Sequence, residues 1–95
     1  MNKYETLYII TPELDEETTK GVIEKFSALT ASNGGEVDKI DEWGKRRLAY
    51  LIDYKSEGYY VLMTFSGPPE LPRELERNFK NDENILRYIV IRKEA

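Results

Sequence analysis

Strand-like and helical segments alternate along this 95-residue chain in an order that few folds can accommodate. Segments 3–10, 36–53, 59–67 and 85–92 are rich in β-branched and aromatic residues, which is typical of strands. Two other segments repeat apolar residues at the three- and four-residue spacing of a helix face. The order β-α-β-β-α-β predicts one α+β domain over residues 1–95. We expect a ferredoxin-like sandwich, in which two helices cover one face of a four-stranded antiparallel sheet.

Local signals place the ends of these elements. Asp15 is a good N-cap for the first helix, and 33–35 (Asn-Gly-Gly) supplies the residues that end it. Pro72 fits the first position of the second helix. We expect the second strand to bend around 42–44 and a loop over 54–58 to connect it to the third strand.

Alternation along the strands predicts that both faces of the sheet carry large apolar side chains. The two helices can cover only one face, and an exposed apolar face commonly marks an interaction site. The alternative is that these residues are present only because they favour strands. Aliphatic side chains pack against proteins better than they stack on bases, so we predict a protein-partner surface. Its candidate residues are Leu7, Ile9, Leu62, Ile89 and Ile91.

Composition argues against several classes of protein. Without Cys or His, the chain lacks the commonest metal ligands and the commonest general base. The segment after the first strand, "TPELD", is not a Gly-rich phosphate loop, and the carboxylates near residue 15 suit the start of a helix. We therefore predict a protein that is not an enzyme and has no cofactor, metal or small-molecule substrate.

The amino-terminal segment, "MNKYETLYII", lacks the long apolar run of a signal peptide or a membrane span. We expect a cytoplasmic protein that does not associate with a membrane.

Positive charge is concentrated at "WGKRRLAY", residues 43–50, although the net charge of the chain is −4. In an extended strand Lys45 and Arg47 point one way, while Arg46 points the other way with Leu48 and Tyr50. Basic residues beside aromatic rings are typical of contacts with nucleic acid. The alternative is that these charges protect the edge of a sheet from aggregation. The residues alone leave both interpretations open.

One comparison with a known motif is weak. Residues 57–65, "EGYYVLMTF", resemble the central-strand motif of RNA-recognition domains, which have the same order of elements. Glu57 stands at the basic position of that motif and Val61 at its key aromatic position. An RNA-recognition-type domain therefore stays an alternative.

A second resemblance covers the whole chain. "KYETLYIITPELDEE", "WGKRRLAY", "EGYY" and "NILRYIVIRKE" resemble the small-subunit ribosomal protein S-six family of bacteria. The resemblance implies a structural constituent of the small ribosomal subunit. It also implies binding to the central domain of 16S ribosomal RNA together with ribosomal protein S-eighteen, in support of assembly and translation. Another alternative is a regulatory ferredoxin-like domain that binds a ligand or oligomerises.

The resemblance also suggests where RNA binds. Arg46 and Arg47 match basic hairpin positions of the family, Lys3 matches a basic residue near the amino terminus, and Arg87 matches one at the last strand. With the neighbouring Lys45, these are the predicted RNA-binding residues. Leu51 departs from the family, whose members often have Pro or Glu there. The sequence stops at Ala95, whereas some members of the family have a longer acidic tail.

Overall fold

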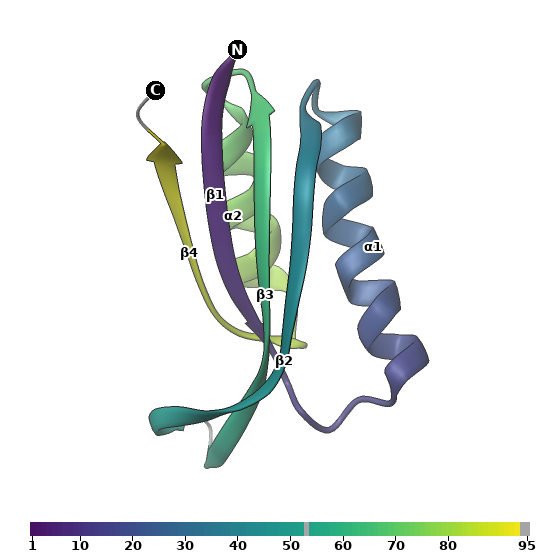
Figure 1. The fold of residues 1–95 in the computed structure, drawn as a ribbon, viewed down its shortest axis with the longest axis vertical. Helices are drawn as coiled ribbons and strands as arrows, with labels where there is room; N and C mark the ends of the chain where they lie inside the picture. The colour runs from purple at the N-terminus through teal and green to yellow at the C-terminus, as the bar shows by residue number, and fades with distance from the viewer. Residues whose placement is uncertain (53, 94–95) are drawn as a thin grey trace.

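The computed structural model describes residues 1–52 and 54–93 and confirms the predicted fold (Figure 1). Its elements are, in chain order, β1 (Asn2–Ile10), α1 (Glu16–Ser32), β2 (Glu36–Ile52), β3 (Lys55–Gly67), α2 (Leu71–Asn81) and β4 (Ile85–Lys93). The strands form one antiparallel sheet in the order β2-β3-β1-β4. Consequently β2 and β4 are the two edges of the sheet.

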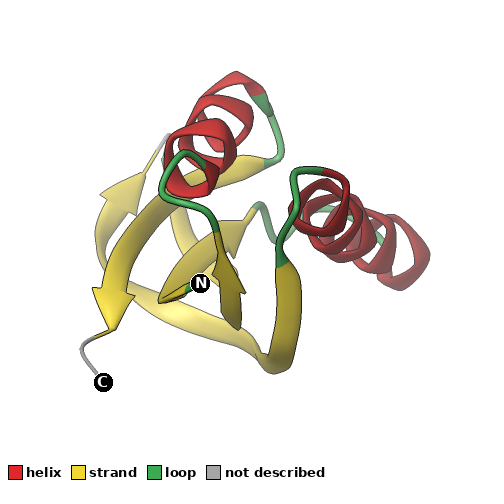
Figure 2. Cartoon of the chain, turned by 90° about the horizontal axis from the view of Figure 1, so that it is seen from above, coloured by secondary structure: helices red, strands yellow, loops and turns green. Residues whose placement is uncertain are grey.

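Both helices lie on the same face of the sheet (Figure 2), and the core fills the space between the two layers. Tyr8 is fully buried there, with its ring centroid 5.5 Å from that of Phe26 and 5.0 Å from that of Phe79. Tyr88 of β4 extends this cluster, 5.3 Å from Phe79. The strand residues in the core are those that alternation predicts, including Tyr4, Thr6, Ile10, Val61, Met63 and Phe65.

Helix α1 begins and ends where its sequence signals predict. The Asp15 carboxylate accepts a hydrogen bond of 2.7 Å from the backbone N–H of Thr18. Hydrogen bonding to the side chain and the backbone of Thr18 lowers the pKa of Asp15. At the other end the N–H of Asn33 donates to Leu29, and Gly34 has a φ of 81°. Helix α2 starts one residue before the predicted Pro72, at Leu71.

The predicted loop over 54–58 is wrong. Strand β3 already begins at Lys55, which is paired with Ile52, so the two strands continue almost to the tip of the hairpin. Asp53 lies outside the described residues. The pairing is irregular before the tip: four residues of β2 lie between Arg47, opposite Glu57, and Ile52, opposite Lys55, but only one residue of β3 lies between those partners.

The predicted bend at 42–44 is confirmed and is a β-bulge. Glu42 is opposite Val61 and Gly44 is opposite Tyr60, so Trp43 is an extra residue in β2. Gly44 has a φ of 81°, a conformation that glycine adopts without strain.

Beyond the bulge, the end of the β2–β3 hairpin leaves the plane of the sheet and curves toward β4 (Figure 1). We call residues 45–52 and 54–58 the arm. Leu48 is 8% exposed, and a side chain at Gly58 would meet both Leu48 and Ile9 of β1. The arm therefore packs over β1, on the face of the sheet that the helices leave open.

Candidate functional site

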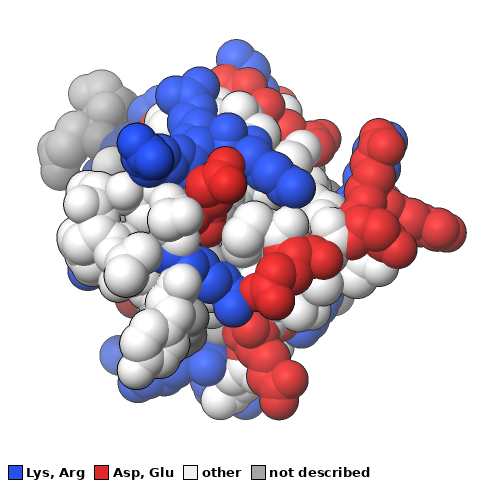
Figure 3. All heavy atoms as spheres, turned by 90° about the horizontal axis from the view of Figure 1, so that it is seen from below, with Lys and Arg blue, Asp and Glu red and all other residues white. Residues whose placement is uncertain are grey.

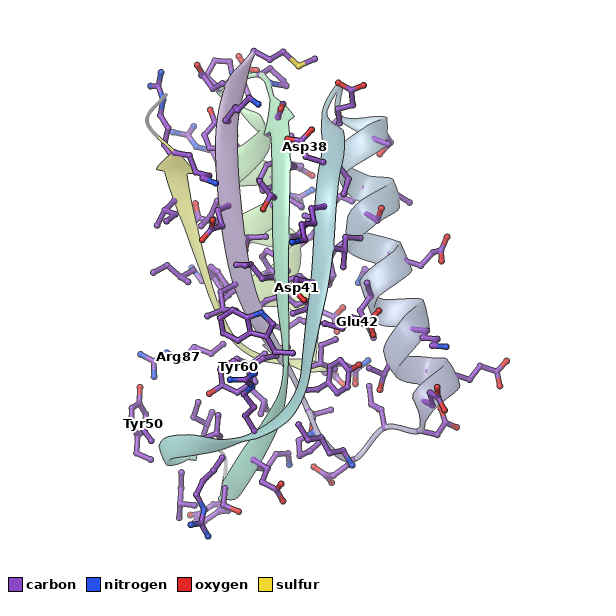
Figure 4. The ribbon with its side chains drawn as sticks, in the orientation of Figure 1. Asp38, Asp41, Glu42, Tyr50, Tyr60 and Arg87 are labelled. Atoms are coloured by element: carbon purple, nitrogen blue, oxygen red, sulfur yellow. The ribbon has the colours of Figure 1, made fainter. Side chains whose placement is uncertain are left out.

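Aromatic and guanidinium groups meet on the open face where the arm begins. The Trp43 and Tyr60 rings are nearly parallel, with an interplanar angle of 10° and centroids 6.2 Å apart. The Arg46 guanidinium lies 5.1 Å from the centroid of the Trp43 ring. The indole N–H donates a 3.3 Å hydrogen bond to Asp41, whose side chain points to the same face near Tyr60 (Figure 4). Residues from β2 and β3 thus hold the indole in one orientation.

A second pair of the same kind joins the two edges of the sheet. The Arg87 guanidinium of β4 lies 5.2 Å from the ring centroid of Tyr50, which comes from the arm (Figure 4). Tyr50 is 57% exposed, so much of its ring is accessible to solvent. We call Trp43, Arg46, Tyr50, Tyr60 and Arg87 the guanidinium–aromatic strip.

Lys45 and Arg47, the other two basic residues of the segment 43–50, are opposite residues that belong to the helix side of the sheet. Lys45 is paired with Tyr59, and Arg47 with Glu57. Lys45 lines a shallow pocket beside the start of α1, where Tyr59 donates a 2.8 Å hydrogen bond to Glu42. That bond raises the pKa of Tyr59. The predicted separation of Arg46 from Lys45 and Arg47 agrees with this geometry.

Lys3 lies away from the guanidinium–aromatic strip. It is exposed and is paired with Ser66 and Lys93, whereas Arg87 is paired with Ile9 near the opposite end of β1. Six steps along β1 separate these two points, about 20 Å at the usual rise per residue. Lys3 and Arg87 therefore lie toward opposite ends of the open face, whereas Lys45 and Arg47 lie on the other side of the arm.

The predicted protein-partner residues form a row across the open face. Leu7 is paired with Leu62 on one side and with Ile89 on the other, which places the three in adjacent strands. Ile89 is 55% exposed and Ile91 is 48% exposed, whereas Leu7 and Leu62 are half-buried. Ile9 is only 8% exposed because the arm packs over it, so it offers little surface of its own.

Charge is unevenly distributed at the arm's end of the molecule. Figure 3 shows Lys and Arg side chains over much of the upper part of that view, whereas carboxylates project on the right, the side on which α1 lies in Figure 1. Segregation of this kind gives an acidic chain a local positive field.

The predicted site residues include the cations of the strip but not the aromatic rings that accompany them. Trp43, Tyr50 and Tyr60 were not among the predicted site residues, although the mixture of rings and cations in residues 43–50 is a signal for them. Simple alternation places Trp43 on the same side as Lys45, and the bulge moves it to the side of Arg46.

Other kinds of site find little support in the described part of the chain. No three carboxylates gather there closely enough to hold a metal ion. Neither helix in residues 1–52 and 54–93 is both long and apolar enough to cross a lipid bilayer.

The fold and its open face define a ferredoxin-like binding domain, with an apolar row and a basic, aromatic arm on the face that the helices leave free. Residues 3–92 match the family described as "Ribosomal protein S6", and the chain belongs to that family. It is thus a structural, non-enzymatic component of the small ribosomal subunit, which in bacteria is cytoplasmic.

Individual relatives agree with this assignment. The chain is 55% identical to a small ribosomal subunit protein bS6 of Thermoanaerobacter pseudethanolicus, with 97% of each chain covered. It is 51% identical to that of Clostridium novyi, with 99% of each covered. Among solved structures, 30S ribosomal protein S6 of Thermotoga maritima superposes with a TM-score of 0.92 at 28% identity, over 97% of this chain and 87% of the other.

Proposed function

We propose that this chain binds the central domain of 16S ribosomal RNA as a pair with ribosomal protein S-eighteen. The arm contacts the RNA, and the apolar row on the open face contacts the protein. The observation that carries the proposal is the juxtaposition of these two chemically different surfaces on the one face that the helices do not cover.

The chemistry of the arm favours RNA. Lys45, Arg46 and Arg47 are consecutive and exposed, and alternation directs them to two sides of one strand. A narrow hairpin with cations on both sides can enter a groove and contact phosphates on either side of it. Contacts with phosphate position such a protein on RNA, whereas contacts with bases provide specificity.

The acidic net charge of −4 suits a protein that binds as one member of a pair. A basic partner supplies much of the long-range attraction to phosphate, and this chain supplies shape and local contacts. The row formed by Leu7, Leu62 and Ile89 is the surface on which we place that partner. Burying an apolar side chain of this size contributes about 1.5–3 kcal/mol.

The Arg46→Ala/Arg47→Ala double variant tests the RNA contact. Each phosphate contact contributes about 0.7–0.9 to the slope of log affinity against log salt concentration, so we expect the slope to flatten by about 1.5. The measurement uses the preformed complex with ribosomal protein S-eighteen and a central-domain RNA fragment. The Arg73→Ala/Lys80→Ala variant is the control, because it removes the same charge from α2, on the opposite layer.

The alternative role of these cations predicts a different result. If they only protect the sheet edge, the double variant aggregates sooner while the RNA affinity and the salt slope stay unchanged. That result would contradict RNA binding by the arm. It would move the proposed contacts to Lys3 and Arg87.

A further inference from the structure

We propose that the guanidinium–aromatic strip binds unpaired nucleotides and that a nucleobase stacks on the Trp43 indole. This inference rests on the proposed function, because it specifies which kind of RNA structure the arm recognises. It excludes a regular base-paired helix as the partner of the strip.

The indole is fixed in place before any ligand binds. The Tyr60 ring packs against it at 6.2 Å and 10°, and its N–H donates to Asp41 at 3.3 Å. Trp43 nevertheless remains 36% exposed. A ring held in this way loses little conformational entropy when a second flat group packs on it, which favours binding.

Guanidinium groups beside the rings complete a combination that suits single-stranded RNA. The Arg46 guanidinium carbon lies over the Trp43 ring, 5.1 Å from its centroid, and that of Arg87 lies over the Tyr50 ring, 5.2 Å from its centroid. Aromatic rings stack on the flat face of a base, while a neighbouring guanidinium can pair with a phosphate or stack as well. The strip offers this combination twice, at residues seven positions apart along β2.

A base-paired helix cannot use such a surface. Its base faces are stacked on one another, and in the A-form helix of RNA the major groove is too deep and narrow for side chains to read. Rings become useful only where bases are splayed out, in loops, bulges and junctions. The exposed indole therefore favours unpaired nucleotides over a duplex.

A protein occupant fits the strip less well than RNA does. Packing protein over Arg46 and Arg87 would take two guanidinium groups out of water, at a cost unless anions accompany them. Phosphates supply these anions along the whole RNA strand. The nearby Asp41 carboxylate already accepts the hydrogen bond from Trp43. The apolar row, by contrast, offers a protein a surface of Leu and Ile.

Because Trp43 is the single tryptophan of the chain, a fluorinated tryptophan label reports on the strip alone. We would label this chain, form the complex with unlabelled ribosomal protein S-eighteen, and follow the fluorine resonance. The probes are a 12-nucleotide single-stranded RNA and the same strand annealed into a blunt duplex. We expect the single strand to shift the resonance at lower concentration, since stacking tolerates any base sequence.

Three outcomes of this titration would overturn the inference. A shift of equal size at equal concentration with the duplex would show that unpaired bases are not required. A shift caused by ribosomal protein S-eighteen, with no further change on adding RNA, would make the protein the occupant. If neither RNA shifts the fluorine resonance, no base stacks on the indole.

Substitutions of Trp43 measure the contribution to binding. Trp43→Leu keeps apolar bulk and removes the π face, so we expect the affinity of the complex for a central-domain RNA fragment to fall about 5- to 150-fold. Trp43→Phe keeps an aromatic ring, so we expect the affinity of that variant for the RNA to fall less. Neither variant removes a charge, so the salt slope stays unchanged. Equal RNA affinity of the Trp43→Leu variant and the parent would contradict stacking on the indole. If the Trp43→Leu variant does not fold, the fluorine titration of the parent protein tests the stacking instead.

These results also separate this inference from the proposed function. If the Arg46→Ala/Arg47→Ala variant flattens the salt slope while Trp43→Leu changes nothing, the arm binds RNA without stacking. If neither variant has an effect on RNA binding, the proposed role of the arm is itself wrong.

Discussion

At the scale of single residues, Tyr8 is the least expected feature of the core. Its ring packs between Phe26 and Phe79, but its hydroxyl has no hydrogen-bond partner among the described residues. An unpaired buried hydroxyl costs about 1–3 kcal/mol. Burial raises the pKa of the Tyr8 phenol above its ordinary value, and the negative charge of Glu42 raises it further.

The Tyr8→Phe substitution should therefore stabilise the fold, by about 1 kcal/mol at neutral pH in urea unfolding. The pH dependence has a definite sign. Above about pH 10 the tyrosine ionises in the unfolded chain but not in the folded one, so the parent protein loses up to about 1.4 kcal/mol of stability per pH unit that the variant retains.

Tyr54→Phe is the matched control, because it removes the same hydroxyl group from a side chain that is 97% exposed. Its unfolding free energy should follow that of the parent at every pH. A Tyr8→Phe variant as sensitive to alkali as the parent would show that Tyr8 is not protonated in the folded protein at high pH.

At the scale of elements, the arm is held by close packing rather than by the sheet alone. Gly58 of β3 lies against Ile9 of β1 and faces Leu48 across the hairpin. Only a residue without a side chain permits this approach. The contact of Tyr50 with Arg87 then connects the arm to β4, the opposite edge of the sheet.

We expect Gly58→Ala to destabilise the protein by about 1–3 kcal/mol, because the added methyl group overlaps the buried and β-branched Ile9. Gly21→Ala is the control: Gly21 is exposed on α1 with no neighbouring atom within 4 Å of an added methyl group. That change should stabilise the helix by about 1 kcal/mol. Urea unfolding of both variants measures the difference, and a Gly58→Ala variant as stable as the parent would mean that the arm is not packed on β1.

At the scale of the whole molecule, the two faces of the sheet differ in what they contact. The helix side of the sheet forms a closed core, whereas the open side keeps Ile89 and Ile91 about half exposed. The row and the strip lie on the same open side, so protein and RNA can bind next to each other. Substitutions in the row should then affect the partner and leave the core intact.

The Leu62→Ser/Ile89→Ser variant tests that separation. We expect weaker binding to ribosomal protein S-eighteen, by about 2 kcal/mol or more in calorimetry, since central apolar residues dominate such interfaces. Leu51→Ser is the control, because it removes a leucine that is 62% exposed on the arm, outside the row. Unchanged affinity in a folded double variant would exclude this face and indicate an edge or loop as the docking site.

The sequence by itself determined the order of elements, the ends of α1 and the residues of the core. These features depend on interactions between residues close together in the chain: Asp15 caps a helix three residues ahead, and strand side chains alternate whatever their neighbours are. The sequence also predicted the candidate basic residues of the arm, because positive charge is concentrated there although the net charge of the chain is negative. The resemblance of whole segments to one family then indicated the function.

Only the tertiary structure decided which side chains share a surface. The bulge at Trp43 depends on how β2 pairs with β3, and it reverses the side that simple alternation assigns to this ring. The burial of Ile9 and the contact between Tyr50 and Arg87 depend on the curvature of the arm across the sheet. Such contacts join residues far apart in the chain, and their geometry depends on the pairing and twist of several strands together, which no local pattern of residues encodes.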